Sequence, residues 1–272
     1  PIAGNIEKVS AILDIPAGGG SAVRAAQIAV DEKIALPILI GRRETIERNI
    51  ASLGLRLRPD VDAEVIEVAR DLRTHNYSEI YRSMLARRGV SPKHAQNVVR
   101  TQPVVFGALM VRRGEADAMI CGTTGRYTEY YNHILDIIGL KPGVNNAAAM
   151  NMLILPKGSF FLCDTYVNPD PTAEQVVEIT RMAADEVRGF GIEPKVALLS
   201  HSNFGSADTP SARKMRRAYQ LASQQFPDLE LDGEMHADAA LSEAIRTRTR
   251  PASRLKGEAK LLVMPTHDAA KI

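Results

Sequence analysis

Short apolar runs alternate with helical patterns along almost the whole chain. Such runs cover residues 11–15, 37–40, 117–121 and 196–199, and each is followed by a loop and a helical segment. Apolar strands joined by helical crossovers are typical of parallel sheets, because parallel neighbours need a connection long enough to return along the sheet. A chain of 272 residues can bury a large core and form one large or two smaller α/β domains.

The pattern changes in the middle of the chain. Residues 139–143 combine two glycines with a proline, which indicates a linker or hinge. Two apolar runs follow, at residues 150–155 and 160–163, and the turn between them contains Pro156 and Gly158. This spacing predicts an antiparallel pair of strands inside an otherwise parallel sheet.

The loop after the strand 196–199 is the first candidate binding site. It is rich in small polar residues, of which we single out Ser200, Ser202, Asn203, Gly205 and Ser206. A helix is predicted after Pro210, so backbone N–H groups and hydroxyls lie at a strand's carboxyl end next to a helix N-terminus. That arrangement favours an anion such as phosphate. The alternative is a strand-to-helix turn whose small residues serve only steric needs.

A second loop has the same position relative to its strand. It follows residues 117–121 and contains Thr123, Thr124 and Arg126 before a predicted helix. Ligands of open α/β sheets bind at such strand ends, and Arg126 would supply a positive charge for an acid or phosphate. The alternative is an ordinary turn with a solvated arginine.

Other candidate sites have simpler structural explanations. The run Gly18-Gly19-Gly20 lacks the spacing of a dinucleotide-binding or P-loop motif, so a flexible turn is favoured over a nucleotide site. Cys121 ends a strand beside a small-residue loop, which places a nucleophile well, but a small residue packed under the loop is the favoured interpretation.

A polar cluster near residue 235 raises the question of a metal. Asp232, Glu234, His236 and Asp238 alternate along the chain and carry side chains that bind divalent ions. No second histidine cluster or H-E-x-x-H helix completes a zinc site. We therefore favour structural roles, such as a helix cap at Asp238, and predict no metal site.

Composition limits the class of protein. The net charge of +2 and the 5% aromatic content give no electrostatic or stacking drive toward nucleic acid. No apolar run is long enough to cross a bilayer, and no leader resembles a signal peptide. Both cysteines, Cys121 and Cys163, lie in apolar runs, as expected in a reducing compartment. We expect a soluble cytoplasmic protein with no nucleic-acid or membrane partner.

Several motifs together resemble one known family. They are Leu199–Ser206, Asp164–Asn168 with Pro171–Gln175, Asp232–Leu241, Gly139–Leu140 with Pro142–Val144, and Ser253–Gly257 with Met264–Pro265. In this order they resemble the phosphate acetyl/butyryltransferase family over nearly the whole chain. The segments Val111–Asp117 and Cys121–Tyr127, with His201 in the loop, are most similar to the C-terminal phosphotransacetylase-like domain of bacterial NADP-dependent malic enzymes.

The resemblance implies a fold and its boundaries. It implies an α/β protein of two α/β/α subdomains with mostly parallel sheets and a cleft between them, similar to isocitrate and isopropylmalate dehydrogenases. Residues 1–141 would form the N-terminal subdomain and residues 142–258 the second, with residues 259–272 returning to the first. The family's closing segment is expected to be absent from this chain.

The resemblance also implies a function. The domain would bind acetyl-CoA or CoA in the cleft, through the loop residues above, as a regulatory and oligomerisation module of a malic enzyme. Its partners would be further copies, as a dimer or a higher oligomer, and the malic-enzyme catalytic domain of a parent chain. Because the Ser-Arg pair of the closing segment is missing, we expect no turnover and name no catalytic residue, no metal and no covalently bound cofactor. The alternative is an active phosphate acetyltransferase, which converts acetyl-CoA and phosphate to acetyl phosphate and CoA.

Overall fold

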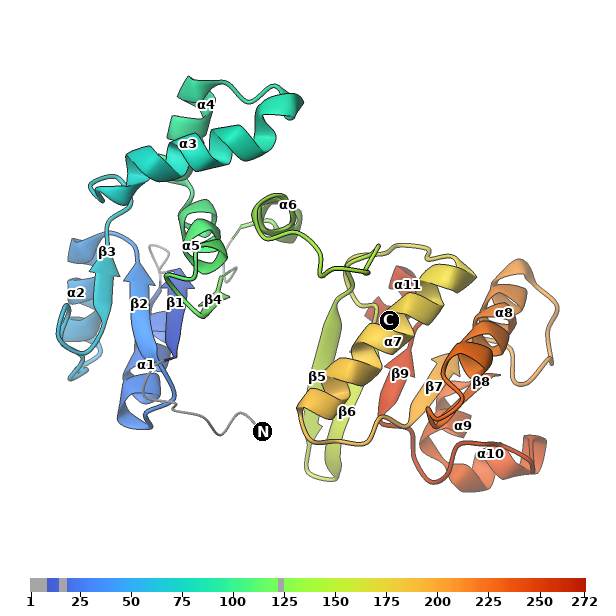
Figure 1. Ribbon diagram of the computed structural model, residues 1–272. Helices are drawn as coiled ribbons and strands as arrows, with labels where there is room; N and C mark the ends of the chain where they lie inside the picture. Colours follow the sequence, from blue (N-terminus) through green and yellow to red (C-terminus); the bar gives the residue numbers. More distant parts are fainter. Residues whose placement is uncertain (1–8, 15–18, 122–124) are drawn as a thin grey trace. The chain divides into compact units, whose positions relative to one another are not determined.

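The computed structural model describes residues 9–14, 19–121 and 125–272, and the backbone separates into two compact units. The N-terminal unit is Pro1–Gly139 and the C-terminal unit is Leu140–Ile272. Each unit holds its own sheet with helices packed on both faces (Figure 1). The α/β class with mostly parallel sheets is therefore confirmed.

The sheet of the N-terminal unit has four parallel strands in the order β3-β2-β1-β4. These are β1 (Ser10–Asp14), β2 (Leu36–Ile40), β3 (Glu64–Ile66) and β4 (Ala118–Ile120). The helices are α1 (Gly20–Asp31), α2 (Arg43–Ser52), α3 (Arg73–Leu85), α4 (Pro92–Thr101), α5 (Pro103–Arg112) and α6 (Tyr127–Ile137), with a 3-10 turn at Ala86–Arg88. Ser91 caps α4, since its hydroxyl accepts from His94 N.

Alternation along the strands of this unit divides its core into two layers. On β1, Ile12 packs with the core under α3–α6, whereas Leu13 packs with the core under α1 and α2. On β2, Ile38 and Ile40 join the first layer and Leu39 joins the second. Such a strand is buried on both faces, which explains why it reads as a continuous apolar run rather than as alternating residues.

The C-terminal unit has a five-stranded mixed sheet in the order β5-β6-β9-β7-β8. The strands are β5 (Met150–Leu155), β6 (Gly158–Cys163), β7 (Val196–Leu199), β8 (Leu231–Met235) and β9 (Leu261–Val263). The predicted antiparallel pair is confirmed as β5 with β6, and the other pairings are parallel.

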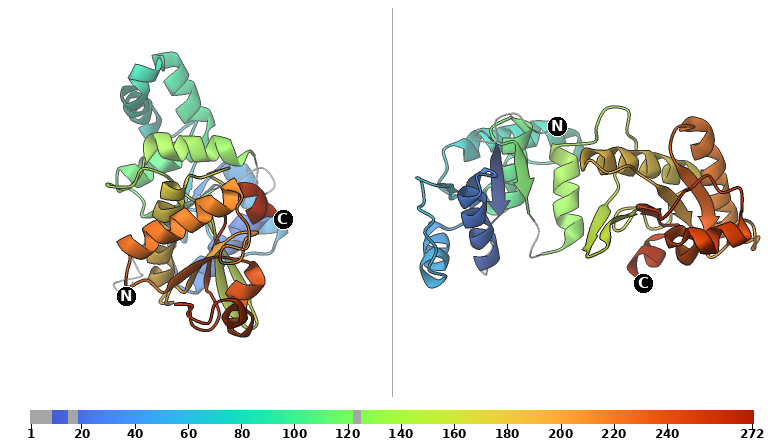
Figure 2. Two further views of the ribbon diagram at one scale, coloured as in Figure 1. Left: turned by 90° about the vertical axis from the view of Figure 1, so that its right-hand side faces the viewer. Right: turned by 90° about the horizontal axis from the view of Figure 1, so that it is seen from below.

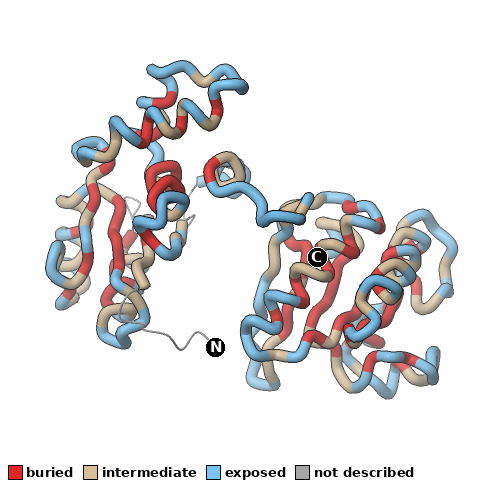
Figure 3. The backbone as a smooth tube through the Cα atoms, viewed as in Figure 1, coloured by how far each residue is buried: buried red, intermediate tan, exposed pale blue. Residues whose placement is uncertain are grey.

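Helices of very different length cover the two faces of this sheet (Figure 2). The long helices α7 (Ala173–Gly189) and α8 (Pro210–Gln225) pack on one face, while the short helices α9 (Ala237–Leu241), α10 (Glu243–Thr249) and α11 (His267–Lys271) belong to the other side. Thr172 and Gln175 form a capping box at the start of α7. In Figure 3 the central strands and the inner helix faces are buried, but β5 is exposed along most of its length.

The last part of the chain is not where the sequence placed it. Residues 259–272 were expected to return to the N-terminal subdomain, but β9 pairs with β6 and with β7 in the C-terminal unit. Leu261 and Val263 contribute to the core under α7 and α8, and Leu262 to the opposite layer. A strand that is fully apolar and buried on both faces belongs in the centre of a sheet, which is the physical reason for its position.

Candidate binding site at the carboxyl ends of β7 and β9

The loop between β7 and α8 is held by its own short hydrogen bonds. Ser202 N donates to Ser200 Oγ over 3.1 Å, and Asn203 N donates to Ser206 Oγ over 2.8 Å. Gly205 has a φ of 91°, in the left-handed region where glycine is favoured. These bonds fix the turn that contains the predicted site residues Ser200–Ser206, whose part in ligand binding stays a prediction.

The buried side chain of Glu234, in β8, anchors this loop through hydrogen bonds. Its Oε1 accepts from Ser202 Oγ over 2.8 Å and from Gly205 N over 2.8 Å. Arg216 of α8 also donates to it, over 3.2 Å. Burial acts to raise the pKa of the Glu234 carboxyl, but the hydrogen bonds from these donors lower it by more, so its pKa lies below the usual range. Glu234 is therefore a charged structural anchor.

The histidines beside the loop connect it to the two helices that follow. His201 Nε2 lies 2.9 Å from the hydroxyl of Thr209, which caps α8 by accepting from Ala212 N. His236 Nε2 lies 2.9 Å from the carbonyl oxygen of His201. His201 of the loop therefore contacts both the residue that caps α8 and the residue that precedes α9.

A pocket of about 370 Å³ opens beside this loop, at the carboxyl ends of β7 and β9. Its lining is Leu199, Ser200, His201, Ser211, Ala237, Met264, Pro265, Thr266 and Ala269. Three hydroxyls and an imidazole therefore face a partly apolar hollow. The first turn of α8 contributes Ser211, and the N-terminus of a helix of this length favours a negative charge. The pocket can hold a ligand that combines an apolar part with an anionic or hydrogen-bonding part.

Only one of the predicted loop residues, Ser200, lines this pocket. Ser202 is fully buried, and its hydroxyl donates a hydrogen bond to Glu234 Oε1. The sequence reasoning missed Ser211 and Thr266 as pocket residues and mentioned His201 only as part of a resemblance. Thr266 caps α11, since its hydroxyl accepts from Ala269 N over 3.3 Å. The helix-start signals Thr209-Pro210 and Thr266 mark the starts of the two helices that carry these hydroxyls.

The remaining predicted residues belong to the N-terminal unit. Arg126 precedes α6, is largely exposed, and lies 3.9 Å from Glu129. Thr123 and Thr124 lie outside the described residues. Their part in binding stays a prediction.

The acidic cluster near residue 235 has structural roles. Asp232 lies inside β8, fully buried, and accepts from Ser253 Oγ over 2.6 Å and from Arg254 N over 3.0 Å. Asp238 Oδ1 accepts from Ala239 N in the first turn of α9. Within the described residues no group of three or more His, Cys, Asp and Glu side chains is arranged to hold a metal ion.

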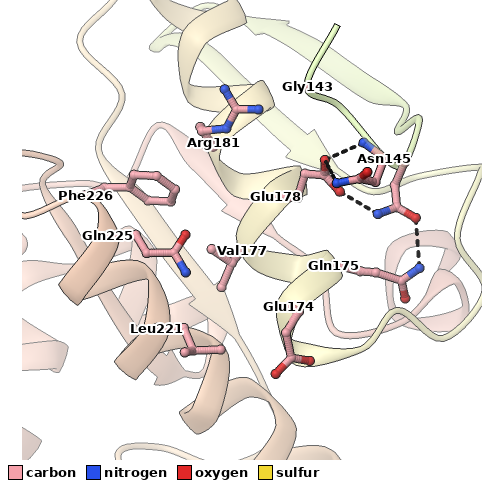
Figure 4. A pocket seen from close by; sticks show the side chains of 11 residues that line it. Gly143, Asn145, Glu174, Gln175, Val177, Glu178, Arg181, Leu221, Gln225 and Phe226 are labelled. Carbon is pink, nitrogen blue, oxygen red and sulfur yellow. Dashed lines mark hydrogen bonds between the residues drawn. The ribbon is translucent and has the colours of Figure 1, made fainter. Parts of the chain in front are cut away.

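A second pocket, of about 400 Å³, lies over α7 and α8 (Figure 4). On one side, Glu178 accepts from Asn145 N over 2.7 Å and also from the Asn146 side chain, whose Oδ1 accepts from Gln175. These polar groups bond one another and fasten the segment after the unit boundary to α7. Because these polar groups are occupied by one another, we favour a structural role for this side of the pocket.

Comparison with known proteins identifies the family. The family model described as phosphate acetyl/butaryl transferase matches residues 16–272. The chain belongs to this family. It is 50% identical over 273 residues to an NADP-dependent malic enzyme of Escherichia coli, with 100% of this chain and 36% of that protein covered. It is 32% identical over 243 residues to a phosphate acetyltransferase of Salmonella typhimurium, with 89% of this chain and 33% of that protein covered.

A solved structure supports the same assignment. A phosphotransacetylase from Streptococcus pyogenes superimposes with a TM-score of 0.85 at 28% identity, with 96% of this chain and 79% of that chain covered. The present chain spans about a third of the length of the curated relatives it matches. In the described part of the chain, no helix is both long and apolar enough to cross a membrane.

Proposed function

We propose that this chain is the phosphotransacetylase-like domain of a larger malic enzyme. The support is the difference between two similarities: 50% identity to a malic enzyme of which this chain covers 36%, and 32% identity to a phosphate acetyltransferase. The parent protein would carry a catalytic domain for malate oxidation, and the complete assembly would be a cytoplasmic homo-oligomer.

The ligand of the domain is acetyl-CoA or CoA. One observation carries this proposal: a chain of the transferase family has a pocket at the carboxyl ends of β7 and β9, lined by the hydroxyls of Ser200, Ser211 and Thr266. Hydroxyls and a helix N-terminus suit the phosphates or the amides of CoA, and the apolar walls at Leu199 and Met264 suit its acyl arm.

Binding serves regulation and assembly, and the domain itself does not turn over. Transfer of an acetyl group from acetyl phosphate to CoA requires a base that deprotonates the CoA thiol, whose sulfur then bonds the acetyl carbon while phosphate leaves. In the candidate site the carboxylate of Glu234 is buried under the loop, where Arg216, Ser202 and Gly205 saturate it, so it is no general base. Ligand binding would instead change the affinity or activity of the rest of the parent enzyme.

The direct test has two measurements on this chain and on its full-length parent. Calorimetric titration with acetyl-CoA is expected to show saturable binding, and thermal unfolding is expected to shift upward with ligand. A mixture of acetyl phosphate and CoA is expected to give no acetyl-CoA above the uncatalysed rate. Robust turnover would contradict the regulatory proposal and establish the active transferase in its place, whereas no binding at all would remove both.

A further inference from the structure

Strand β5 is an exposed apolar edge. Among the described residues it pairs with β6 alone, at the end of the strand order β5-β6-β9-β7-β8. Its sequence, Met-Asn-Met-Leu-Ile-Leu, holds no charged residue and no proline. Four consecutive large side chains are exposed in the C-terminal unit: Met152 by 37%, Leu153 by 45%, Ile154 by 78% and Leu155 by 42%.

Edge strands that remain in water normally carry devices that prevent pairing. Charged side chains, prolines, bulges and very short strands are the usual ones. Strand β5 has six residues, and its register with β6 is regular from Met150 to Leu155. An apolar, regular and uncharged edge of this length is a template for another strand.

The hydrogen bonds of β6 show which groups of β5 face outward. Phe161 N donates to Lys260 O, and Cys163 O accepts from Met264 N, so these two residues face β9. Because successive residues of a strand point their backbone groups to opposite sides, Leu162 faces β5 and bonds its partner Asn151. Ala149 O likewise accepts from Thr165 N. The even-numbered residues of β5 therefore present their N–H and C=O groups to the open edge.

We propose that this edge pairs antiparallel with β5 of a second copy of the chain, so that two five-stranded sheets join across a two-fold axis. The register that satisfies every outward group of β5 sets Met152 opposite Met152 of the second copy and Met150 opposite Ile154. Asn151 then lies opposite Leu153. This inference rests on the proposed homo-oligomer and gives it a surface.

The edge suits a second copy because it is complementary to itself. A two-fold interface brings identical patches together, so a charged residue on the strand would lie near the same charge of the second copy and repel it. Strand β5 has no charged residue, so this repulsion does not arise. In this register the only charged residue of the turn, Lys157, lies opposite Ala147 of the second copy. Cross-strand contact covers the exposed methionine and isoleucine side chains of the edge.

The experiment combines a cross-link with a disruption, made in the full-length parent. In the proposed register the two Met152 Cα atoms lie about 5.5 Å apart, within the range that a disulfide bridges. Mild oxidation of Met152→Cys is expected to give a covalent dimer in most of the protein. The matched control Ile245→Cys, at a position of similar exposure (39%) on α10, is expected to give none.

Disruption uses Ile154→Lys, which should not disturb folding because the side chain is 78% exposed. It is expected to raise the dimer dissociation constant, measured by sedimentation, by about tenfold or more, since it sets two lysines at the joined edge. Ile245→Lys should leave that constant unchanged.

An oligomer that survives Ile154→Lys, without a cross-link at residue 152, would overturn the inference and leave the proposed function standing. A cross-link formed only within one chain, or to a different protein, would also overturn it. Acetyl-CoA titration of the same variants tests the proposed function separately.

Discussion

Nη2 of Arg216 lies 3.2 Å from Oε1 of Glu234, a carboxylate that is 2% exposed. The same oxygen receives the Ser202 hydroxyl and the Gly205 amide. One negative charge thus joins strand β8, the β7–α8 loop and helix α8. The shape of the candidate binding loop depends on a residue that does not belong to it.

Replacing Glu234 by glutamine is expected to destabilise the C-terminal unit by about 1–3 kcal/mol. The amide keeps the size of the side chain but removes the charge and turns donors toward the Arg216 guanidinium. Urea unfolding measures the loss. Glu186→Gln, at an exposed position near the end of α7, should change stability by less than about 0.5 kcal/mol. Equal stability of the two variants would show that Glu234 is no anchor.

The same carboxylate predicts a dependence of stability on acid. Its folded pKa lies below its ordinary value of 4.5, so it stabilises the fold above the unfolded pKa and loses that contribution as the pH falls through the folded pKa. The melting temperature of the wild type should therefore fall more steeply between about pH 5 and pH 3 than that of Glu234→Gln. Parallel pH profiles of the two proteins would refute the assignment.

Arg246 is a second buried charge whose removal should be costly. Its guanidinium donates to Ala239 O over 2.8 Å, to Leu255 O over 2.9 Å and to Gly257 O over 2.7 Å. Arg246→Met leaves these carbonyl groups without donors and is expected to cost about 3–5 kcal/mol.

Arg246→Lys should recover only part of that loss, because one ammonium group cannot reach the directions of a planar guanidinium. Denaturant unfolding checks both variants. The control Arg248→Met, exposed in the same helix, should be nearly neutral. A neutral Arg246→Met would mean that the loop 250–257 does not need its donors.

Filling the pocket should block the ligand. Ser211 lines the pocket from the first turn of α8, and Ser211→Phe would occupy part of its roughly 370 Å³. We expect the affinity for acetyl-CoA to fall at least about tenfold, since the ring displaces the acyl arm from the hollow. Calorimetric titration gives the affinity. Gln220→Phe, exposed on the same helix, should bind as the wild type does, and unchanged binding by both variants would move the site elsewhere.

Features with a local cause could be predicted from the sequence. The hairpin of β5 and β6 follows from two apolar runs around a Pro-Lys-Gly turn, and the start of α7 follows from the capping box at Thr172. In both cases the residues that decide the structure are neighbours in the chain.

Strand β8 shows where this reasoning ends. This strand runs from Leu231 to Met235 and buries two carboxylates, although its sequence Leu-Asp-Gly-Glu-Met is not a continuous apolar run. Their partners, Ser253 for Asp232 and Ser202 for Glu234, are 21 and 32 residues away. A carboxylate can be buried at low cost only when such partners hydrogen-bond it. Because these partners are distant in the sequence, no local sequence pattern predicts that the two carboxylates are buried.

The sequence singled out the loop Ser200–Ser206, but of its predicted residues only Ser200 lines the pocket beside it. Small polar residues indicated the turn at Ser200–Ser206, yet Ser202, Asn203 and Ser206 are used to build it. Ser211 and Thr266 come from helix starts 55 residues apart, and only the parallel neighbours β7 and β9 bring them together. The sequence alone does not show that adjacency.

The central position of β9 in its sheet also determines the order in which the two units can fold during synthesis. All strands of the N-terminal sheet have been synthesised once Ile120 is added, so that unit can fold while the chain is still growing. In the C-terminal unit β6 and β7 remain separated until Leu261–Val263 arrive between them. While the roughly one hundred residues between β6 and β9 are synthesised, β5 stays exposed and the edges of β6 and β7 that later pair with β9 have no partner strand. This half of the chain is therefore the one that would need a chaperone's protection on the ribosome.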